Sequence, residues 1–266
     1  MMVPSLHQGV TGLADLALKA STDRKTQARK AQKNTFGLLP ASGGEFGTCP
    51  DATHGKGGCA HIKKNGKRMT CYVDPLMRAY PNIRAVLAHN TFLVRNANYE
   101  QLVMLLRKEF NRFYKLEMKK TNPWPYYRLH WSGDFFSETY VEATAKAISL
   151  HPEIHFWAYT RSFRTIPNIV DHFEPLKNLQ LYLSLDPQNS EDGLKLWYRH
   201  QKNHPDTRLQ VAWMGTKEGY ENQPWEKPKT STCPELTGHL PLQSACFHCQ
   251  KCLGSRRSPV SILFTA

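Results

Sequence analysis

Four short runs of aromatic and aliphatic residues recur along the middle of the chain, and each predicts a buried β-strand. The runs begin 25 to 29 residues apart, a spacing typical of repeated supersecondary units. Their hydrophobic residues stand at consecutive positions, as in strands that are covered on both faces of a parallel sheet. The runs are YRLHWS (127–132), IHFWAYT (154–160), LQLYLSL (179–185) and RLQVAWM (208–214).

Helical patterns precede and separate these runs. The clearest spans Tyr99 to Lys120, where apolar residues recur at helical spacing behind Asn98 as the N-cap. Ser137 and Ser190 are expected to cap two further helices. Strands joined by helices form a parallel sheet, so we predict an α/β fold: a full or partial TIM-like β/α barrel, with one or two less certain strands upstream. A doubly wound open sheet is the alternative.

Composition divides the chain into three parts. Residues 1–34 form a polar, basic leader with a flexible end. Residues 35–218 hold the barrel-like core, including a glycine- and lysine-rich loop over 49–71 with three cysteines. The hydrophobic pattern stops after Gly215, and residues 219–266 form a C-terminal segment with the other four cysteines.

The net charge of the chain is +13, and the pI is about 9.4. Such a charge attracts polyanions. It is also uneven, since five Lys or Arg and no carboxylate lie between Ala52 and Val73. Nucleic acid or a nucleotide is therefore an expected partner, and a merely solvated basic surface is the alternative.

No run approaches the roughly 20 apolar residues that cross a bilayer, and the first 20 residues do not resemble a secretory signal. We therefore expect a cytoplasmic protein with no membrane partner. Cytoplasmic thiols stay reduced, and the cysteine count of seven is odd. Clustered cysteines in such a protein indicate metal ligands in preference to disulfides.

The C-terminal cysteines carry the more specific motif. Cys246, Cys249 and Cys252 form C-x2-C-x2-C, with Cys233 thirteen residues upstream. Three thiolates at these steps match the wrapping of a [4Fe–4S] cluster in bacterial ferredoxins. A structural zinc site more often uses two separated C-x2-C pairs. We expect an iron–sulfur cluster, with zinc as the alternative, in which either His239 or His248 could replace a thiolate.

The N-terminal cysteines Cys49, Cys59 and Cys71 have the looser spacing C-x9-C-x11-C. Three unrelated thiols are one interpretation, because free cysteine often behaves as a small hydrophobic residue. The other is a second cluster, held by three thiolates that leave one iron open to a ligand.

Polar residues follow each predicted strand, where parallel folds bind their ligands. We expect them to form a pocket, although several could instead cap helices. The predicted catalytic residues are Asp134, Tyr159 and Asp186. The predicted cofactor-binding residues are Ser132, Gly133, Asp134, Thr160, Arg161 and Ser184. The end of the fourth strand carries Trp213, Gly215 and Lys217.

Several segments, in this order, resemble the bacteriophage gene-product-88-type family over residues 34–252. They are FGLLPASGGEFGTCPDA, CYV, RLHWSGDFFSETYVEATAKAI, PEIHFWAYTRS and the closing TCP…CFHCQKC. That family in turn resembles the radical S-adenosylmethionine enzymes, which have a partial β/α barrel.

The resemblance implies roles for particular residues. Cys49, Cys59 and Cys71 would hold a [4Fe–4S] cluster that binds S-adenosylmethionine, and the C-terminal four cysteines an auxiliary cluster. Ser132, Gly133 and Asp134 would match the motif that holds the methionine amino group. Tyr159, Thr160, Ser184 and Asp186 would line the pocket more deeply.

The radical enzymes space their three cysteines as C-x3-C-x2-C, and both gaps are much longer here. Three functions therefore stay open. The first is a radical S-adenosylmethionine-like enzyme that acts on a phosphate-bearing substrate such as a nucleotide or nucleic acid, or on a peptide, with a reductant protein as partner. The others are a non-catalytic nucleic-acid-binding protein with structural metal sites, and a zinc protein of the same shape.

Overall fold

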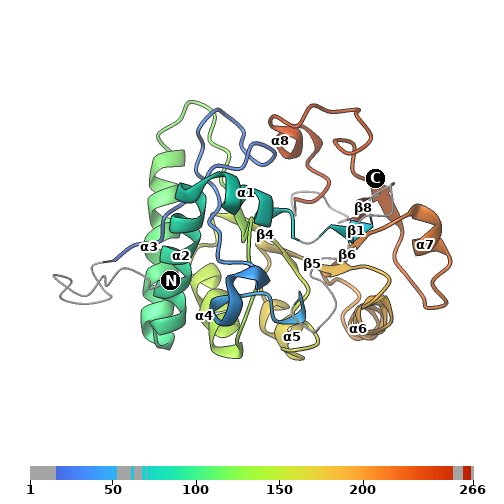
Figure 1. Ribbon diagram of the computed structural model, residues 1–266. Helices are drawn as coiled ribbons and strands as arrows, with labels where there is room; N and C mark the ends of the chain where they lie inside the picture. Colours follow the sequence, from blue (N-terminus) through green and yellow to red (C-terminus); the bar gives the residue numbers. More distant parts are fainter. Residues whose placement is uncertain (1–15, 53–60, 63–67, 70, 254–259, 265–266) are drawn as a thin grey trace.

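The computed structural model describes residues 16–52, 61–62, 68–69, 71–253 and 260–264. At its centre is a six-stranded parallel sheet with the strand order β3-β4-β5-β6-β8-β7 (Figure 1). The strands are β3 (Tyr126–Leu129), β4 (His155–Thr160), β5 (Leu179–Leu185), β6 (Gln210–Met214), β7 (Thr230–Thr232) and β8 (Ser261–Phe264). The four predicted runs correspond to β3 to β6, so the predicted α/β fold with a parallel sheet is confirmed.

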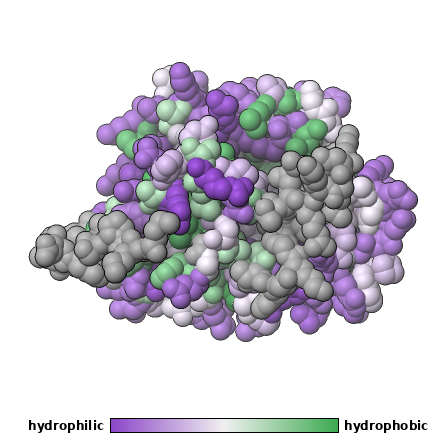
Figure 2. Space-filling model, in the orientation of Figure 1, coloured by the Kyte–Doolittle hydropathy of each residue, from purple (hydrophilic) through white to green (hydrophobic). Residues whose placement is uncertain are grey.

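The described helices flank this sheet. They are α1 (Val73–Ala79), α2 (Pro81–Asn96), α3 (Tyr99–Glu117), α4 (Glu138–Ser149), α5 (Ile169–Phe173), α6 (Ser190–Asn203), α7 (Lys217–Glu221) and α8 (Ala245–Cys249). Two 3-10 helices, η2 (Ala41–Phe46) and η3 (Pro50–Ala52), precede a small hairpin of β1 (His61–Ile62) and β2 (Arg68–Met69). The surface seen in Figure 2 is mainly hydrophilic, with hydrophobic side chains in small groups.

The helix caps agree with the sequence at two of three predicted positions. Asn98 and Gln101 form a reciprocal capping box at the start of α3, and the Ser137 hydroxyl accepts a hydrogen bond at the start of α4. The prediction for Ser190 was wrong, because Asn189 holds the N-cap position of α6. The Ser190 hydroxyl instead donates to the Gln223 side chain over 2.7 Å.

The two faces of the sheet have different coverings, since successive side chains of a strand point to opposite faces. Phe156 and Ala158 of β4 belong to the main core, to which α3, α4, α5 and α6 contribute. Trp157 and Tyr159 point the other way and pack against the C-terminal segment, including Leu253. The crossover helices α4, α5 and α6 thus share one face, whereas a doubly wound sheet has such helices on both.

An upstream segment extends the sheet beside β3. Thr35 forms a parallel bridge with Arg128, and the Leu38 N–H donates to the Ser132 carbonyl over 2.8 Å. Among the described residues the named sheet is open, with β3 and β7 at its ends. The full-barrel form of the prediction is therefore not seen.

The hydrophobic pattern missed two features. Helices α1 and α2 occupy a stretch for which no helix is predicted from the sequence, although Pro81 at the first turn of α2 is a recognised start signal. The sheet also continues beyond Gly215, because β7 and β8 come from the segment with the last four cysteines. Both strands are short, and β7 is a polar edge strand that no hydrophobic run marks.

Candidate functional site

A buried hydrogen-bonded network lies at the carboxyl ends of β3, β4 and β5. Asp134 accepts hydrogen bonds from the backbone N–H groups of Phe135 (2.8 Å) and Arg161 (2.7 Å). The Arg161 guanidinium donates to Asp186 over 2.7 Å. Burial raises the pKa of Asp134 to about 6. The hydrogen bonds that its carboxylate accepts act in the opposite direction, because they favour the ionised form. The network therefore holds a carboxyl group that can exchange a proton near neutral pH.

The turn after β3 packs directly on the loop that carries Cys49. Gly133 has φ +82°, and a Cβ there would lie 2.5 Å from Thr48 Oγ1 and 2.7 Å from Leu38 Cβ. The Asp134 N–H donates to the same Thr48 hydroxyl over 3.3 Å. Only glycine tolerates both this backbone angle and this close approach, so Gly133 allows the cysteine loop to lie against the strand end.

Asp51 fixes the other side of this loop. Its carboxylate accepts hydrogen bonds from the Thr165 hydroxyl (2.6 Å) and the Arg164 N–H (3.2 Å), both in the segment that follows β4. The loop with Cys49 is thus joined to the ends of two neighbouring strands. Asp51 was not predicted as a site residue. Its position two residues after the candidate ligand Cys49 could have indicated a role in positioning this loop.

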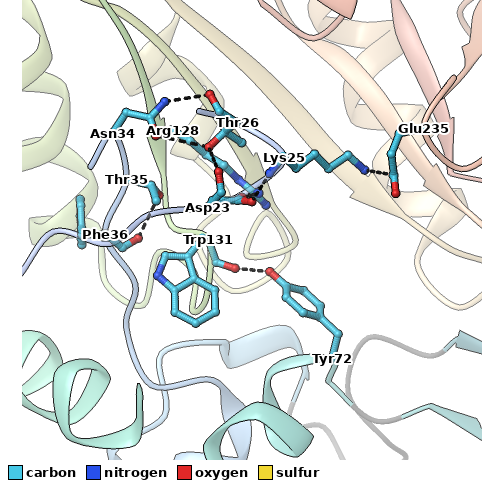
Figure 3. A network of polar contacts seen from close by, with 10 residues as sticks. All are labelled: Asp23, Lys25, Thr26, Asn34, Thr35, Phe36, Tyr72, Arg128, Trp131 and Glu235. Carbon is cyan, nitrogen blue, oxygen red and sulfur yellow. Dashed lines mark hydrogen bonds and ion pairs between the residues drawn. The ribbon is translucent and has the colours of Figure 1, made fainter. Parts of the chain in front are cut away.

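Cys71 is placed at the same end of the sheet. The next residue, Tyr72, donates its hydroxyl hydrogen to the Trp131 carbonyl, directly after β3 (Figure 3). Cys59 lies outside the described residues. The structure therefore brings the chain around two of the three predicted N-terminal ligands to the end of β3.

The remaining predicted residues fall on different sides of the sheet. The Ser132 hydroxyl donates to the Leu38 carbonyl over 2.8 Å, and the Thr160 hydroxyl accepts from a backbone N–H two residues on. Tyr159 and Ser184 belong to the opposite strand face. Tyr159 stacks on Tyr182 there, with ring centroids 5.1 Å apart. Tyr159 therefore faces the C-terminal cysteines, away from the side of the sheet that the crossover helices cover.

The C-terminal cysteines come together around one helical turn. The short helix α8 is bounded by Ser244 (φ +60°) and Gln250 (φ +56°), both in the left-handed region. The Cys246 N–H donates to the Lys25 carbonyl over 2.8 Å, and the Cys233 N–H donates to the carbonyl of Leu263 in β8 over 3.0 Å. The turn is thus anchored to the segment 16–34, and Cys233 to the sheet.

All four of these cysteines line a single cavity on the sheet face opposite the crossover helices. Other lining residues include Lys25, Arg128, Trp157, Tyr159 and Glu235. None of the cysteines in the described ranges forms a disulfide. The cavity therefore gathers four thiols that are up to 19 residues apart in sequence, from Cys233 to Cys252.

Two of the cations that line this cavity are each fixed by a carboxylate (Figure 3). Lys25 pairs with Glu235 over 2.5 Å, and Arg128 pairs with Asp23 over 2.7 Å. The Arg128 guanidinium also lies 5.6 Å from the centre of the Tyr159 ring. Neither cation was predicted. The sequence did offer a signal for Arg128, because a charged residue inside the apolar run that becomes β3 is expected to point away from the main core.

Burial keeps two of these thiols, those of Cys246 and Cys252, protonated in the absence of a metal. It raises the pKa of Cys252 to about 12, while a hydrogen bond with Tyr159 and the charge of Lys25 lower it. Burial also raises the pKa of Cys246, and Lys25 and Arg128 again act in the opposite direction. A metal that binds here must therefore displace protons.

The sulfur atoms of the described cysteines are not gathered at the spacing of a single zinc ion. Thiolates about 2.3 Å from one zinc ion, in tetrahedral geometry, lie about 3.8 Å from one another. Among the described residues, no three cysteine sulfurs lie within 4.8 Å of one another. The one group of potential ligands that meets this limit there, Glu138, Glu142 and His172, lies on α4 and α5 with both carboxylates exposed.

In the part of the chain that the structure describes, no helix is both long and apolar enough to cross a membrane.

Comparison with known proteins finds two relatives in mycobacteriophages. The chain is 32% identical to the "Gene 88 protein" of Mycobacterium phage L5 over 252 residues, which cover 91% of this chain and 95% of that protein. It is also 32% identical to the "Gene 88 protein" of Mycobacterium phage D29 over 254 residues, or 91% and 96%.

A search of solved structures gives no significant match. The model of the family described as "Gene product 88" matches residues 14–257. This match spans nearly the whole chain, including both sets of cysteines. The chain therefore belongs to the gene product 88 family.

Proposed function

We propose that this is an iron–sulfur protein in which Cys233, Cys246, Cys249 and Cys252 hold a [4Fe–4S] cluster. The observation that carries the proposal is that all four side chains line one cavity. Four cysteine thiolates are a common ligand set for such a cluster. Lys25 in the same cavity offsets part of the negative charge that four thiolates bring.

The sulfur spacing supports a cluster over a single zinc ion. In a [4Fe–4S] cluster each thiolate binds a different iron, so the four sulfurs stand further apart than around one ion. This agrees with the absence of any three described cysteine sulfurs within 4.8 Å of one another. A single zinc ion would require at least three of these sulfurs to move closer together.

We also propose that Cys49, Cys59 and Cys71 hold a second cluster that binds S-adenosylmethionine. The anchoring of the Cys49 loop and of Tyr72 to the end of β3 supports this. The sheet also supports it. Strands β3 to β6 are neighbours in chain order, and the helices between them lie on one face, as in a partial β/α barrel. When bound and reduced, such a cluster and S-adenosylmethionine supply radical chemistry that side chains cannot perform.

The chain's own residues would bind and orient the ligands. Arg161, held by Asp186, offers a fixed positive charge for a carboxylate or phosphate. Asp134, with its raised pKa, can hold or release a proton at its carboxyl group. The substrate would be phosphate-bearing, such as a nucleotide or nucleic acid. The protein would act in the host cytoplasm, with a reductant protein as partner.

The net charge of +13 favours a second candidate function. A non-catalytic nucleic-acid-binding protein would use the same basic surface, and its metal sites, iron–sulfur or zinc, would only stabilise the fold. The two candidates differ in whether S-adenosylmethionine is cleaved.

Purification without oxygen, followed by iron and sulfide analysis, tests the cluster. We expect about four irons and four sulfides for each occupied set of cysteines. Cys249→Ser should lose the C-terminal set, whereas His248→Ala, in the same turn, should keep it. A folded preparation that contains zinc, or no metal, would overturn the cluster.

Incubation of the loaded protein with a reductant and S-adenosylmethionine tests the chemistry. The enzyme should release 5′-deoxyadenosine, which chromatography detects. Cys71→Ser should abolish this product but retain the C-terminal iron. A fully loaded, reduced protein that releases none would favour the binding function.

A further inference from the structure

Exposed aromatic side chains gather on one part of the surface. Five Phe or Tyr side chains among the described residues are exposed. Four of them come from η2 and the α1–α2 region: Phe46 (52% exposed), Tyr72 (46%), Tyr80 (57%) and Phe92 (41%). The fifth, Tyr198, lies on α6. Exposed hydrophobic side chains on a protein surface are normally scattered singly. Four exposed aromatic rings in one region therefore indicate a surface that binds a partner.

Arginine outnumbers acidic residues in the same region, where η2, α1 and α2 hold three arginines (78, 84 and 95) against Glu45 and Asp74. Between Pro75 and Asn98 there are three arginines and no carboxylate. Arg78 and Arg84 are exposed, and neither forms an ion pair within the described ranges. On α6, by contrast, Lys195 pairs with Glu191. The arginines of the aromatic region therefore have charge to offer to an anion.

The geometry joins these groups into one surface. Arg84 and Arg95 are eleven residues apart on α2, which places them about 20° apart around the helix axis, and Phe92 lies within about 80° of Arg84. Arg95 donates to the carbonyl of Gly47, the residue after Phe46. Helices α1 and α2 lie side by side (Figure 1). Tyr72 connects this surface to the end of β3.

We infer that this surface of η2, α1 and α2 binds single-stranded nucleic acid and leads it to the strand ends. The inference rests on the proposed function, which leaves the class of phosphate-bearing substrate open. Exposed aromatic rings stack on unpaired bases, and arginines contact the phosphates between them. A duplex hides the faces of its bases, so it would use the arginines alone.

Fluorescence anisotropy with a labelled single-stranded oligonucleotide, as DNA and as RNA, tests this inference. The full-length protein should bind the single strand at least tenfold more tightly than the same sequence as a duplex. The double variant Tyr80→Ala/Phe92→Ala should weaken single-strand binding by roughly tenfold or more and leave duplex binding nearly unchanged.

The arginines make a separate contribution. Arg78→Ala/Arg84→Ala should reduce the slope of log affinity against log salt by about 1.4, the loss of two single-strand phosphate contacts. Tyr198→Ala/Lys202→Ala on α6 is the matched control, and its affinity should equal that of the wild type. Circular dichroism of each variant verifies its fold.

Equal binding by the wild type and Tyr80→Ala/Phe92→Ala would overturn the inference. Equal affinity for single strand and duplex would also overturn it, as would binding that is restricted to a protein partner. Iron analysis of the same preparations separates the two proposals. Protein that contains no iron but binds single strands as expected would support the binding surface and overturn the cluster proposal. Protein that contains the cluster but does not bind single strands would support the cluster and overturn the binding surface.

Discussion

The C-terminal cysteine segment and the N-terminal cysteine loop are anchored to the same sheet in different ways. In the first, Cys233 follows an edge strand, and three more cysteines surround the single turn of α8. In the second, Thr48 and Asp51 attach the chain around Cys49 to the ends of β3 and β4. Backbone hydrogen bonds hold the first region, and side-chain hydrogen bonds hold the second at the strand ends.

This difference has consequences for stability. The C-terminal segment covers a small cluster on the second face of the sheet, in which Cys233 and Cys252 pack against Tyr182 and Ile262. A metal bound there would connect α8 to the sheet and contribute folding free energy. The loop around Cys49 is already held by hydrogen bonds, so a metal there would contribute less to stability.

The largest expected effect comes from removing one ligand in each region. In the loaded protein, Cys249→Ser should lower the free energy of unfolding by on the order of 5 kcal/mol, because metal binding stabilises the folded state. Cys71→Ser should lower it by about 1 kcal/mol. Urea denaturation without oxygen measures both. Equal losses of unfolding free energy in the two variants would contradict the distinction between the two regions. Metal-free protein is the control, because without a metal both variants should change the free energy of unfolding only slightly.

The next effect concerns the strand-end network. Asp186→Ala leaves the buried Arg161 guanidinium without its carboxylate partner, which should lower the free energy of unfolding by about 3 kcal/mol. The C-terminal iron content should stay the same. Glu191→Ala, which breaks the exposed pair with Lys195, is the matched control and should cost only about 0.4 kcal/mol. Loss of the C-terminal iron in Asp186→Ala would show that the two regions are coupled.

A third effect is a pH dependence confined to the strand ends. The pKa of Asp134 is raised by burial to about 6, above its value near 4 in an unfolded chain. The folded state therefore binds this proton more tightly, and its stabilisation is present below pH 4 and lost as the pH rises to 6.

The wild type should therefore lose about 2 to 3 kcal/mol over this interval relative to Asp134→Asn, which cannot titrate. Denaturation of both proteins at several pH values gives this difference. A difference that is independent of pH, or that grows toward acid, would contradict the assigned shift.

The sequence predicted the sheet because β3 to β6 are apolar runs of ordinary length with helices between them. It also grouped the four C-terminal cysteines, which lie close together along the chain and line one cavity in the structure. It could not place Lys25 and Arg128 in the same cavity, because their 103-residue separation is closed only by tertiary contacts. Tyr159 was grouped with Asp134 by position along the chain, but strand alternation turned its side chain to the opposite face.

The smallest expected effect tests whether that cavity controls the properties of the proposed cluster. Lys25 lines the cavity with the cysteines, whereas Arg29, four residues later on the same segment, pairs with Glu117 elsewhere. Lys25→Met removes a positive charge and leaves Glu235 uncompensated, so the more negative, reduced state of a cluster becomes less favourable. The reduction potential should fall by roughly 40 mV, equivalent to about 1 kcal/mol for one electron. A spectroscopic redox titration measures it, and Arg29→Met should leave it unchanged. An unchanged potential in Lys25→Met would mean that the cluster lies outside the cavity that the four cysteines share.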